Sequence, residues 1–133
     1  MISQTVVTIL LPGGGKVRAE LADTPERRRT GLMFRDSLPP DGGMLLAFTD
    51  DDFHGIWMRN CRIALDLLWL DPQGRVIHVV ESAPPCRADP CDSWVPPTPA
   101  RFVLELPAGK AGREGLRLGS QLLIVAIPPL RPS

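Results

Sequence analysis

The apolar segment spanning residues 63–70 carries a single carboxylate, and it constrains the fold of this chain most strongly. In an extended strand, successive side chains point to opposite faces, and here both faces are apolar apart from Asp66. A strand of this kind is covered on both sides, so we expect Asp66 to be buried. A buried carboxylate is costly without a partner, and Arg59 or Arg28 is the partner that we expect.

The rest of the chain is predicted to be mostly β-structure. Threonine and branched apolar residues alternate near the N-terminus, and Gly13, Gly14 and Gly15 then connect two strands as a hairpin. Further apolar or alternating segments are separated by turns such as Asp71-Pro72-Gln73-Gly74. The predicted strands are residues 5–11, 16–21, 44–48, 55–59, 63–70, 75–81, 101–106 and 121–127.

Helices are expected to be few and short. Thr24 followed by Pro25 is typical of a helix start, and this helix should end near Gly31. Residues 108–118 form at most one more short helix, and the six prolines of residues 83–100 predict a long loop. The fold class is therefore mainly β with one or two short helices (β-rich α+β). We expect a single domain over residues 1–133, built as a small barrel or rolled sheet of about seven to eight short strands.

Charge and hydropathy exclude several classes of function. The 15 basic residues balance the 15 acidic ones, which argues against a nucleic-acid or anionic-membrane surface. No apolar run is long enough for a transmembrane segment. The first residues have no basic region and no cleavage site, so we expect a strand there rather than a signal peptide. No phosphate loop, dinucleotide fingerprint or serine elbow occurs, and we expect no cofactor.

Two of the three cysteines, Cys86 and Cys91, lie close together in a proline-rich segment. Their spacing favours a small disulfide ring, although free thiols remain an alternative. A zinc site is a third, less favoured alternative, because His54 and His78 would have to complete it. We therefore predict no metal. Cys61 is interpreted as a small core residue.

Six motifs in the right order resemble one known family. They are GLMFR, GGMLLAF, WMRN, LDLLWLD, PPC and VLELPAG, and they lie between residues 31 and 109; the resemblance as a whole covers about residues 18–127. The chain resembles the family called domain of unknown function 192, small bacterial and archaeal proteins with no established biochemical activity. The resemblance implies that the recurring positions of the family fall here on Arg28, Gly31, Leu32, Met33, Arg35, Gly43, Met44, Trp57, Met58, Asn60, Leu65, Asp66, Cys86, Cys91, Leu104, Glu105 and Gly109.

This chain departs from the family pattern at three positions. Cys61 stands where threonine is usual, Arg59 where lysine is common, and Trp94 where tyrosine often follows the second cysteine. Cys61 rules out a hydroxyl role at its position. Many relatives look exported, to the periplasm or cell envelope, whereas this chain shows no leader and would otherwise be cytoplasmic; the localisation is therefore left open.

The polar residues near the apolar strands are the candidate site. Asp66, Asn60 and Glu105 could form a polar cluster with carboxylates at perturbed pKa, while the favoured alternative has Asp66 paired internally and Glu105 facing solvent. Trp57 could stack on a ligand, although a core position is favoured for it. Of the three consecutive arginines, we expect Arg28 to be structural and the other two solvated.

We therefore hypothesise a non-catalytic binding or accessory module for a small polar ligand or an envelope partner, of unknown oligomeric state. The candidate binding surface comprises Arg28, Trp57, Asn60, Asp66 and Glu105, with the loop between Cys86 and Cys91 as its rim. One alternative is a small hydrolase or lyase that uses Asp66 and Glu105 as a carboxyl pair. Another is a structural protein with no ligand site.

Overall fold

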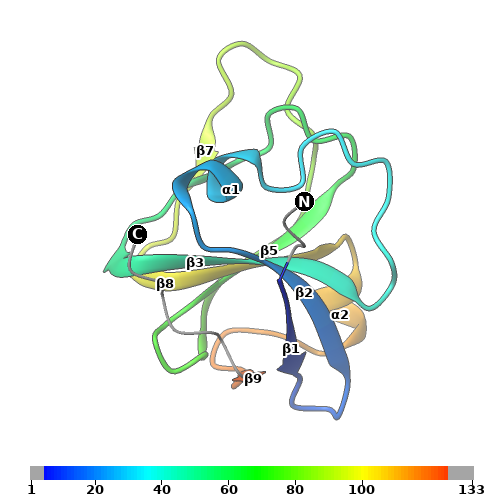
Figure 1. Cartoon of the computed structure of the whole chain (residues 1–133), viewed down its shortest axis with the longest axis vertical. Helices are drawn as coiled ribbons and strands as arrows, with labels where there is room; N and C mark the ends of the chain where they lie inside the picture. Colours follow the sequence, from blue (N-terminus) through cyan, green and yellow to red (C-terminus); the bar gives the residue numbers. More distant parts are fainter. Residues whose placement is uncertain (1–4, 126–133) are drawn as a thin grey trace.

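The computed structural model describes residues 5–125 and shows a large rolled sheet, a two-stranded sheet and two short helices (Figure 1). Seven strands form the large sheet in the order β6-β5-β8-β3-β2-β1-β9, and β4 pairs with β7. The elements are β1 (Val6–Leu10), β2 (Lys16–Ala22), α1 (Pro25–Thr30), β3 (Gly42–Asp52), β4 (Ile56–Trp57), β5 (Leu65–Leu70), β6 (Val76–Ala83), β7 (Ser93–Trp94), β8 (Ala100–Pro107), α2 (Lys110–Arg113) and β9 (Leu123–Val125).

The N-terminal hairpin confirms the strand prediction for this part of the chain. β1 and β2 are antiparallel, and the amide of Leu11 donates to the carbonyl of Gly15 over 2.8 Å across the turn. Gly14 has a φ of 94°, which a residue with a side chain adopts only at a cost. The next pair, β2 and β3, is parallel, and α1 provides the crossover between them.

The strands β5 and β8 and the first half of β3 are largely buried on both faces, which the apolar pattern predicted for β5 alone. Their inner face points into the roll, where residues such as Leu68 and Leu104 pack with β1 and β2. Their outer face carries a second cluster, which includes Leu67 and Trp69. In Figure 1, α1 and β7 lie on the side of the outer face, and β1 and β9 lie on the opposite side.

The sheet is rolled but does not close into a barrel. Its two edge strands, β6 and β9, are joined near one end by an isolated bridge between Arg75 and Gln121. The amide of Val76 also donates to the carbonyl of Ser120 over 2.9 Å. The sequence predicted a small barrel or a rolled sheet, and the structure shows the rolled sheet. The described residues form nine strands, seven in the large sheet and two in the small one.

Helix α1 begins and ends where the sequence signals predict. The hydroxyl of Thr24 accepts from the amide of Arg27 over 3.1 Å, and Pro25 occupies the first turn. At the other end, the amide of Gly31 donates to the carbonyl of Arg27 over 2.8 Å. Gly31 has φ 51° and ψ −131°, a conformation that is essentially restricted to glycine, so the chain leaves the helix sharply at this point.

Several element boundaries differ from the prediction. Strand β3 continues through the acidic residues that we expected to form a turn, because β8 pairs with it as far as Asp52. The proline-rich loop contains the short strand β7, which pairs with β4. Helix α2 has only four residues. Of the strand predicted over residues 121–127, β9 accounts for Leu123–Val125, and residues 126 and 127 lie outside the described residues.

Candidate functional site

A cavity of about 330 Å³ opens between α1 and the outer face of the sheet, and we call it the Glu105 cavity. The described side chains around it come from α1 and the turn after it, from β3, β4, β7 and β8, and from Cys61 in the segment between β4 and β5. Their apolar members form most of the wall, and three charged residues interrupt it. The lining residues are Arg28, Arg29, Thr30, Gly31, Leu32, Met33, Leu46, Phe48, Gly55, Ile56, Trp57, Cys61, Ser93 and Glu105.

Glu105 belongs to the middle of β8, between two apolar neighbours. It pairs with Met44 of β3 on one side and with Leu67 of β5 on the other, and both belong to the outer cluster. The residue is only 4% exposed, so the expectation that it faces solvent is wrong. That expectation assumed an open outer face, whereas α1 and the β4–β7 pair cover it.

The Glu105 carboxyl has no protein partner in the described part of the chain. No hydrogen bond or ion pair reaches its oxygens from residues 5–125, and neither oxygen is fully enclosed by protein. A methyl group at Gly31 would lie 3.8 Å from Oε1 of Glu105, so the glycine leaves space beside the carboxyl. The carboxyl therefore faces the cavity while most of its surface is shielded from bulk water.

Burial changes the ionisation of two groups at this site. Desolvation raises the pKa of Glu105 to about 7. The pKa of Cys61 is raised to about 11, first by desolvation and then by the neighbouring Glu105 carboxyl. Near neutral pH the carboxyl therefore titrates, whereas the thiol stays protonated and is a weak nucleophile.

Arg28 projects from α1 into the same cavity. Its Nη1 donates to the carbonyl of Ala47 over 2.9 Å, and its guanidinium carbon lies 5.1 Å from the centre of the Phe48 ring. His54 also stacks on Phe48, and the centres of the two rings are 3.6 Å apart. These contacts confirm that Arg28 has a structural role, because they hold α1 against β3.

Trp57 and Asn60 lie at the rim of the cavity. Trp57 lines it and is 36% exposed, so the favoured core position is wrong for this tryptophan. Arg59 covers one face of its ring, 5.4 Å from the ring centre. Asn60 lies in an adjoining hollow with Trp57, has a φ of 59° and donates to the sulfur of Met33 over 3.9 Å. The structure thus brings Arg28, Trp57 and Glu105 together, with Asn60 beside them.

Asp66 is separated from this group. It pairs with Leu106 of the inner cluster, whereas Glu105 pairs with Leu67 of the outer cluster, so the two carboxyls lie on opposite faces of the sheet. They do not converge on one cleft, and the predicted carboxyl pair of a hydrolase or lyase is not formed. A difference of one residue in strand position decides this, because successive side chains alternate between faces.

The burial predicted for Asp66 is confirmed, but the predicted arginine partner is wrong. The residue is 0% exposed. Its Oδ1 accepts from the amide of Ser82 over 2.8 Å, and its Oδ2 accepts from the amide of Ala111 over 2.9 Å. The first bond fixes a register shift between β5 and β6, and the second satisfies an orphan amide in the first turn of α2. Asp66 is a structural acceptor that joins two distant segments.

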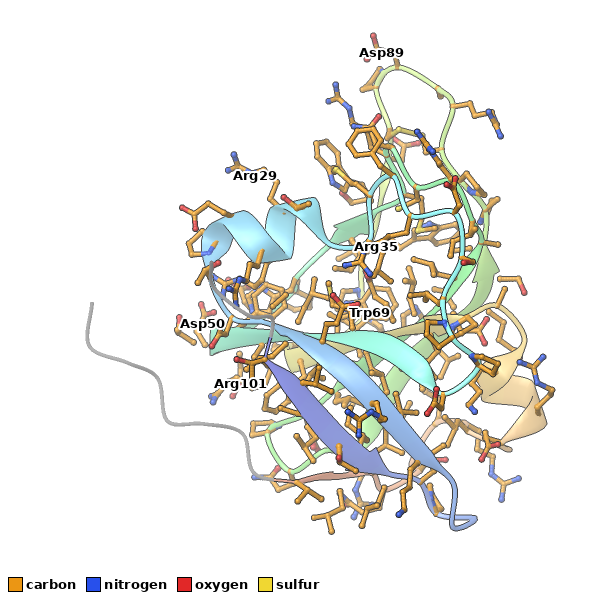
Figure 2. The ribbon with its side chains drawn as sticks, turned by 45° about the vertical axis from the view of Figure 1, so that its right-hand side comes forward. Arg29, Arg35, Asp50, Trp69, Asp89 and Arg101 are labelled. Carbon is orange, nitrogen blue, oxygen red and sulfur yellow. A yellow bond between two sulfur atoms is a disulfide. The ribbon has the colours of Figure 1, made fainter. Side chains whose placement is uncertain are left out.

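Cys86 and Cys91 form the disulfide that the spacing favours. They close a small loop that projects beyond the sheet, and Figure 2 shows Asp89 at its tip. The disulfide removes these two residues as thiolate ligands for zinc. Within residues 5–125, no group of three His, Cys, Asp or Glu residues is arranged to hold a metal. Over the same residues, no helix is long and apolar enough to cross a membrane.

The disulfide makes a direct prediction about thiol counts. The chain has three cysteines, of which Cys61 is free. Alkylation in denaturant without reductant should therefore add one alkyl group, and alkylation after reduction should add three, as measured by intact mass spectrometry. Before denaturation, the single adduct should form slowly, because a thiol with a raised pKa holds little thiolate. Three adducts without reduction would contradict the disulfide.

Some lining residues were not singled out from the sequence. Phe48 was assigned only to a predicted strand, Met33 appeared only among the recurring positions of the family, and Gly31 was interpreted as a helix end. For Glu105 the sequence did contain a signal of burial, because it is the only acid in the apolar segment VLELP. The alternation of side chains along that strand instead suggested that Glu105 faces solvent. A strand with apolar residues on both faces predicts a buried acid, as the same reasoning does for Asp66.

The comparisons with known proteins identify relatives but no activity. The model of the family DUF192, described as an uncharacterized ACR, matches residues 8–124. A crystal structure of a "putative transcription regulator" from Sinorhizobium meliloti is 30% identical, with a TM-score of 0.83, over 93% of this chain and 97% of that one. A protein of unknown function from Novosphingobium aromaticivorans is 30% identical, with a TM-score of 0.80, over 90% and 84% of the two chains. No curated protein matches the sequence.

Proposed function

The chain belongs to the DUF192 family, and from that premise we propose that it is a non-catalytic binding module for a small polar ligand. The ligand occupies the Glu105 cavity and donates a hydrogen bond to the Glu105 carboxyl. One observation carries this proposal: a carboxyl that is almost completely buried, has no partner among the described residues and faces a cavity.

An unpartnered buried carboxyl favours a ligand site because it is costly for the protein alone. The large majority of buried polar side chains have a hydrogen-bond partner in the protein, whereas the Glu105 oxygens open only to the cavity and are desolvated by burial. Asp66 shows the usual solution in this same protein, with two backbone amides as partners. A ligand that donates to Glu105 would remove the cost.

The cavity also has the size and lining of a ligand site. Its volume of about 330 Å³ lies at the lower end of the range typical for small-molecule pockets. Buried apolar side chains, among them Leu32, Leu46 and Ile56, form its walls, and a few polar groups are placed between them. Trp57 at the rim offers a flat surface on which a ligand can stack.

Binding is favoured over catalysis because no second carboxyl and no imidazole lies beside Glu105 among the described residues that line the cavity. The other buried carboxyl, Asp66, is on the opposite face of the sheet. The thiol of Cys61 is protonated near neutral pH, since its pKa is raised to about 11. His54 is stacked on Phe48, and its Nε2 lies 3.1 Å from the carbonyl oxygen of Asp50.

The name of the Sinorhizobium protein raises regulation of transcription as another possible function. This chain gives that possibility little support. Its basic and acidic residues are equal in number, whereas nucleic-acid-binding domains usually have a basic surface. The two helices in the described part of the chain have six and four residues, too short for a recognition helix with its partner.

The Cys86–Cys91 disulfide indicates the kind of compartment in which the module would function. Disulfides persist mainly in oxidising compartments such as the periplasm and the extracellular space. The disulfide loop adjoins Trp57 and Asn60, so its reduction would alter the rim of the cavity. We therefore favour the cell envelope or the exterior as the place of binding.

An NMR screen with small fragments tests the proposed function. Amines, amides and alcohols are added to the labelled protein, and the amide signals are followed by heteronuclear correlation spectra. We expect at least one such donor to shift the backbone amide signals of Gly31 and Glu105 and the indole signal of Trp57. Glu105→Gln should weaken its binding about tenfold or more, because a hydrogen bond to a charged group is lost.

The matched control for this screen is Glu81→Gln, the same chemical change at an exposed residue outside the cavity. This variant should bind the fragment as the unchanged protein does. A screen in which no donor shifts the three signals would overturn the proposed function. Equal binding by the Glu105→Gln variant would show that the carboxyl is not the anchor.

A further inference from the structure

The Glu105 cavity holds groups of both charges that do not meet. The Glu105 carboxyl comes from β8, and the Arg28 guanidinium comes from α1 and lies against β3. No hydrogen bond or ion pair joins them among the described residues, although salt bridges of Arg35 with Glu20 and of Arg101 with Asp51 form elsewhere in the chain. The two charges are therefore available to different parts of one ligand.

Arg28 keeps donors that its structural contacts do not use. Only Nη1 has a partner in the described part of the chain, the carbonyl of Ala47. An arginine presents five N–H groups in a planar fork that suits a carboxylate. Because Nη1 and the Phe48 ring fix the guanidinium, little side-chain entropy would be lost on binding an anion.

The remaining charge in the wall is also positive. Arg29 lines the cavity, and Figure 2 shows its side chain extending outward from α1. A simple cation would pair with Glu105 but would be repelled by Arg28 and Arg29. A simple anion would pair with the arginines but would leave Glu105 without a partner, or would be repelled by it when it is ionised. A ligand with one charge of each sign satisfies both sides.

We propose that the ligand is a small zwitterion with an apolar side group, of the kind represented by a free hydrophobic amino acid. This inference rests on the proposed function and narrows its ligand class. The ammonium group donates to Glu105, and the carboxylate accepts from Arg28. The apolar side group packs against the apolar wall and reaches the ring of Trp57.

Three ligands that share a phenylethyl group test this inference by calorimetric titration at about pH 8, where Glu105 is ionised. L-Phenylalanine carries both charged groups, 2-phenylethylamine only the ammonium and 3-phenylpropanoate only the carboxylate. We expect L-phenylalanine to bind about tenfold or more tightly than 2-phenylethylamine, since each charge-assisted hydrogen bond adds affinity. 3-Phenylpropanoate should bind more weakly still.

Substitutions in α1 locate the carboxylate. Arg28→Gln should abolish the preference for L-phenylalanine over 2-phenylethylamine, and it should not weaken the binding of the amine, because the substitution removes a positive charge that repels the ammonium group. Arg27→Gln is the matched control, because Arg27 belongs to the same helix and does not line this cavity. If the Arg28→Gln variant does not fold, the three-ligand comparison on the unchanged protein still decides the question.

Equal affinities for the amine and the amino acid would overturn the zwitterion inference and leave the proposed function in place. Tightest binding by 3-phenylpropanoate would overturn the inference and point to an anion site at Arg28. Binding by none of the three overturns the inference as well. The fragment screen then decides separately whether Glu105 anchors any ligand.

Discussion

Replacing Asp66 by asparagine is expected to lower the free energy of unfolding by about 3 kcal/mol. The carboxylate of Asp66 is 0% exposed and accepts one amide at each oxygen. Asparagine keeps one acceptor oxygen but turns an amide nitrogen toward the second N–H group, so that a buried donor faces a donor. Urea denaturation followed by circular dichroism at neutral pH measures the change. Because small domains are stable by roughly 5–15 kcal/mol, the variant should still fold.

Asp71→Asn is the matched control for this prediction. Asp71 also accepts two backbone amides, from Gln73 and Arg75, both over 2.9 Å. Both bonds end on Oδ1, which asparagine keeps as its amide oxygen, and they lie in an exposed turn, so we expect a loss below about 1 kcal/mol. Similar losses for the two variants would show that neither burial nor the second acceptor oxygen sets the value of the Asp66 bonds.

The contrast between burial and partners for Asp66 shows what the sequence can predict. Its burial follows from the apolar residues around it, which is local information. Its partners, Ser82 and Ala111, are 16 and 45 positions away. Their amides are free only because β6 shifts its register and because α2 begins beside β5. Contacts between backbone segments that are far apart in the chain leave no pattern in the local sequence.

The outer face of the sheet was the least predictable part of the fold. The strand positions of Trp57 and Glu105 follow from the alternation of side chains, and that part of the prediction was sound. Which face is covered depends on how α1 and β4 fold back over β3 and β8, and the turns after them determine this. As a result, Trp57 was predicted to be buried but is partly exposed, and Glu105 was predicted to face solvent but is buried. Helix α1 was predicted correctly because its cap, proline and glycine are local signals.

Replacing Glu105 by glutamine is expected to raise the free energy of unfolding at alkaline pH. The effect of the substitution at alkaline pH should be about 3 kcal/mol more stabilising than its effect at acid pH. Burial raises the pKa of Glu105 from 4.5 to about 7 in the folded state. The folded protein therefore holds a proton that the unfolded chain has lost, and stability falls as the pH rises between these two values. The cost is absent below about pH 4.5 and complete above about pH 7. Glutamine has no such proton, so the variant should lose this pH dependence.

Urea denaturation at about pH 5 and about pH 8 measures this difference, and Glu20→Gln is a control that should destabilise the protein by nearly the same amount at both pH values, because the stability linked to its lowered pKa changes only below about pH 4.5. The hydrogen bond from Arg35 lowers the pKa of Glu20, so this carboxylate stabilises the fold above its unfolded pKa. Its replacement should cost up to about 1 kcal/mol at pH 8, because the pair is partly exposed. If Glu105→Gln instead lowered stability at pH 8, the ionised Glu105 would have a stabilising partner, and a ligand would not be needed to supply one.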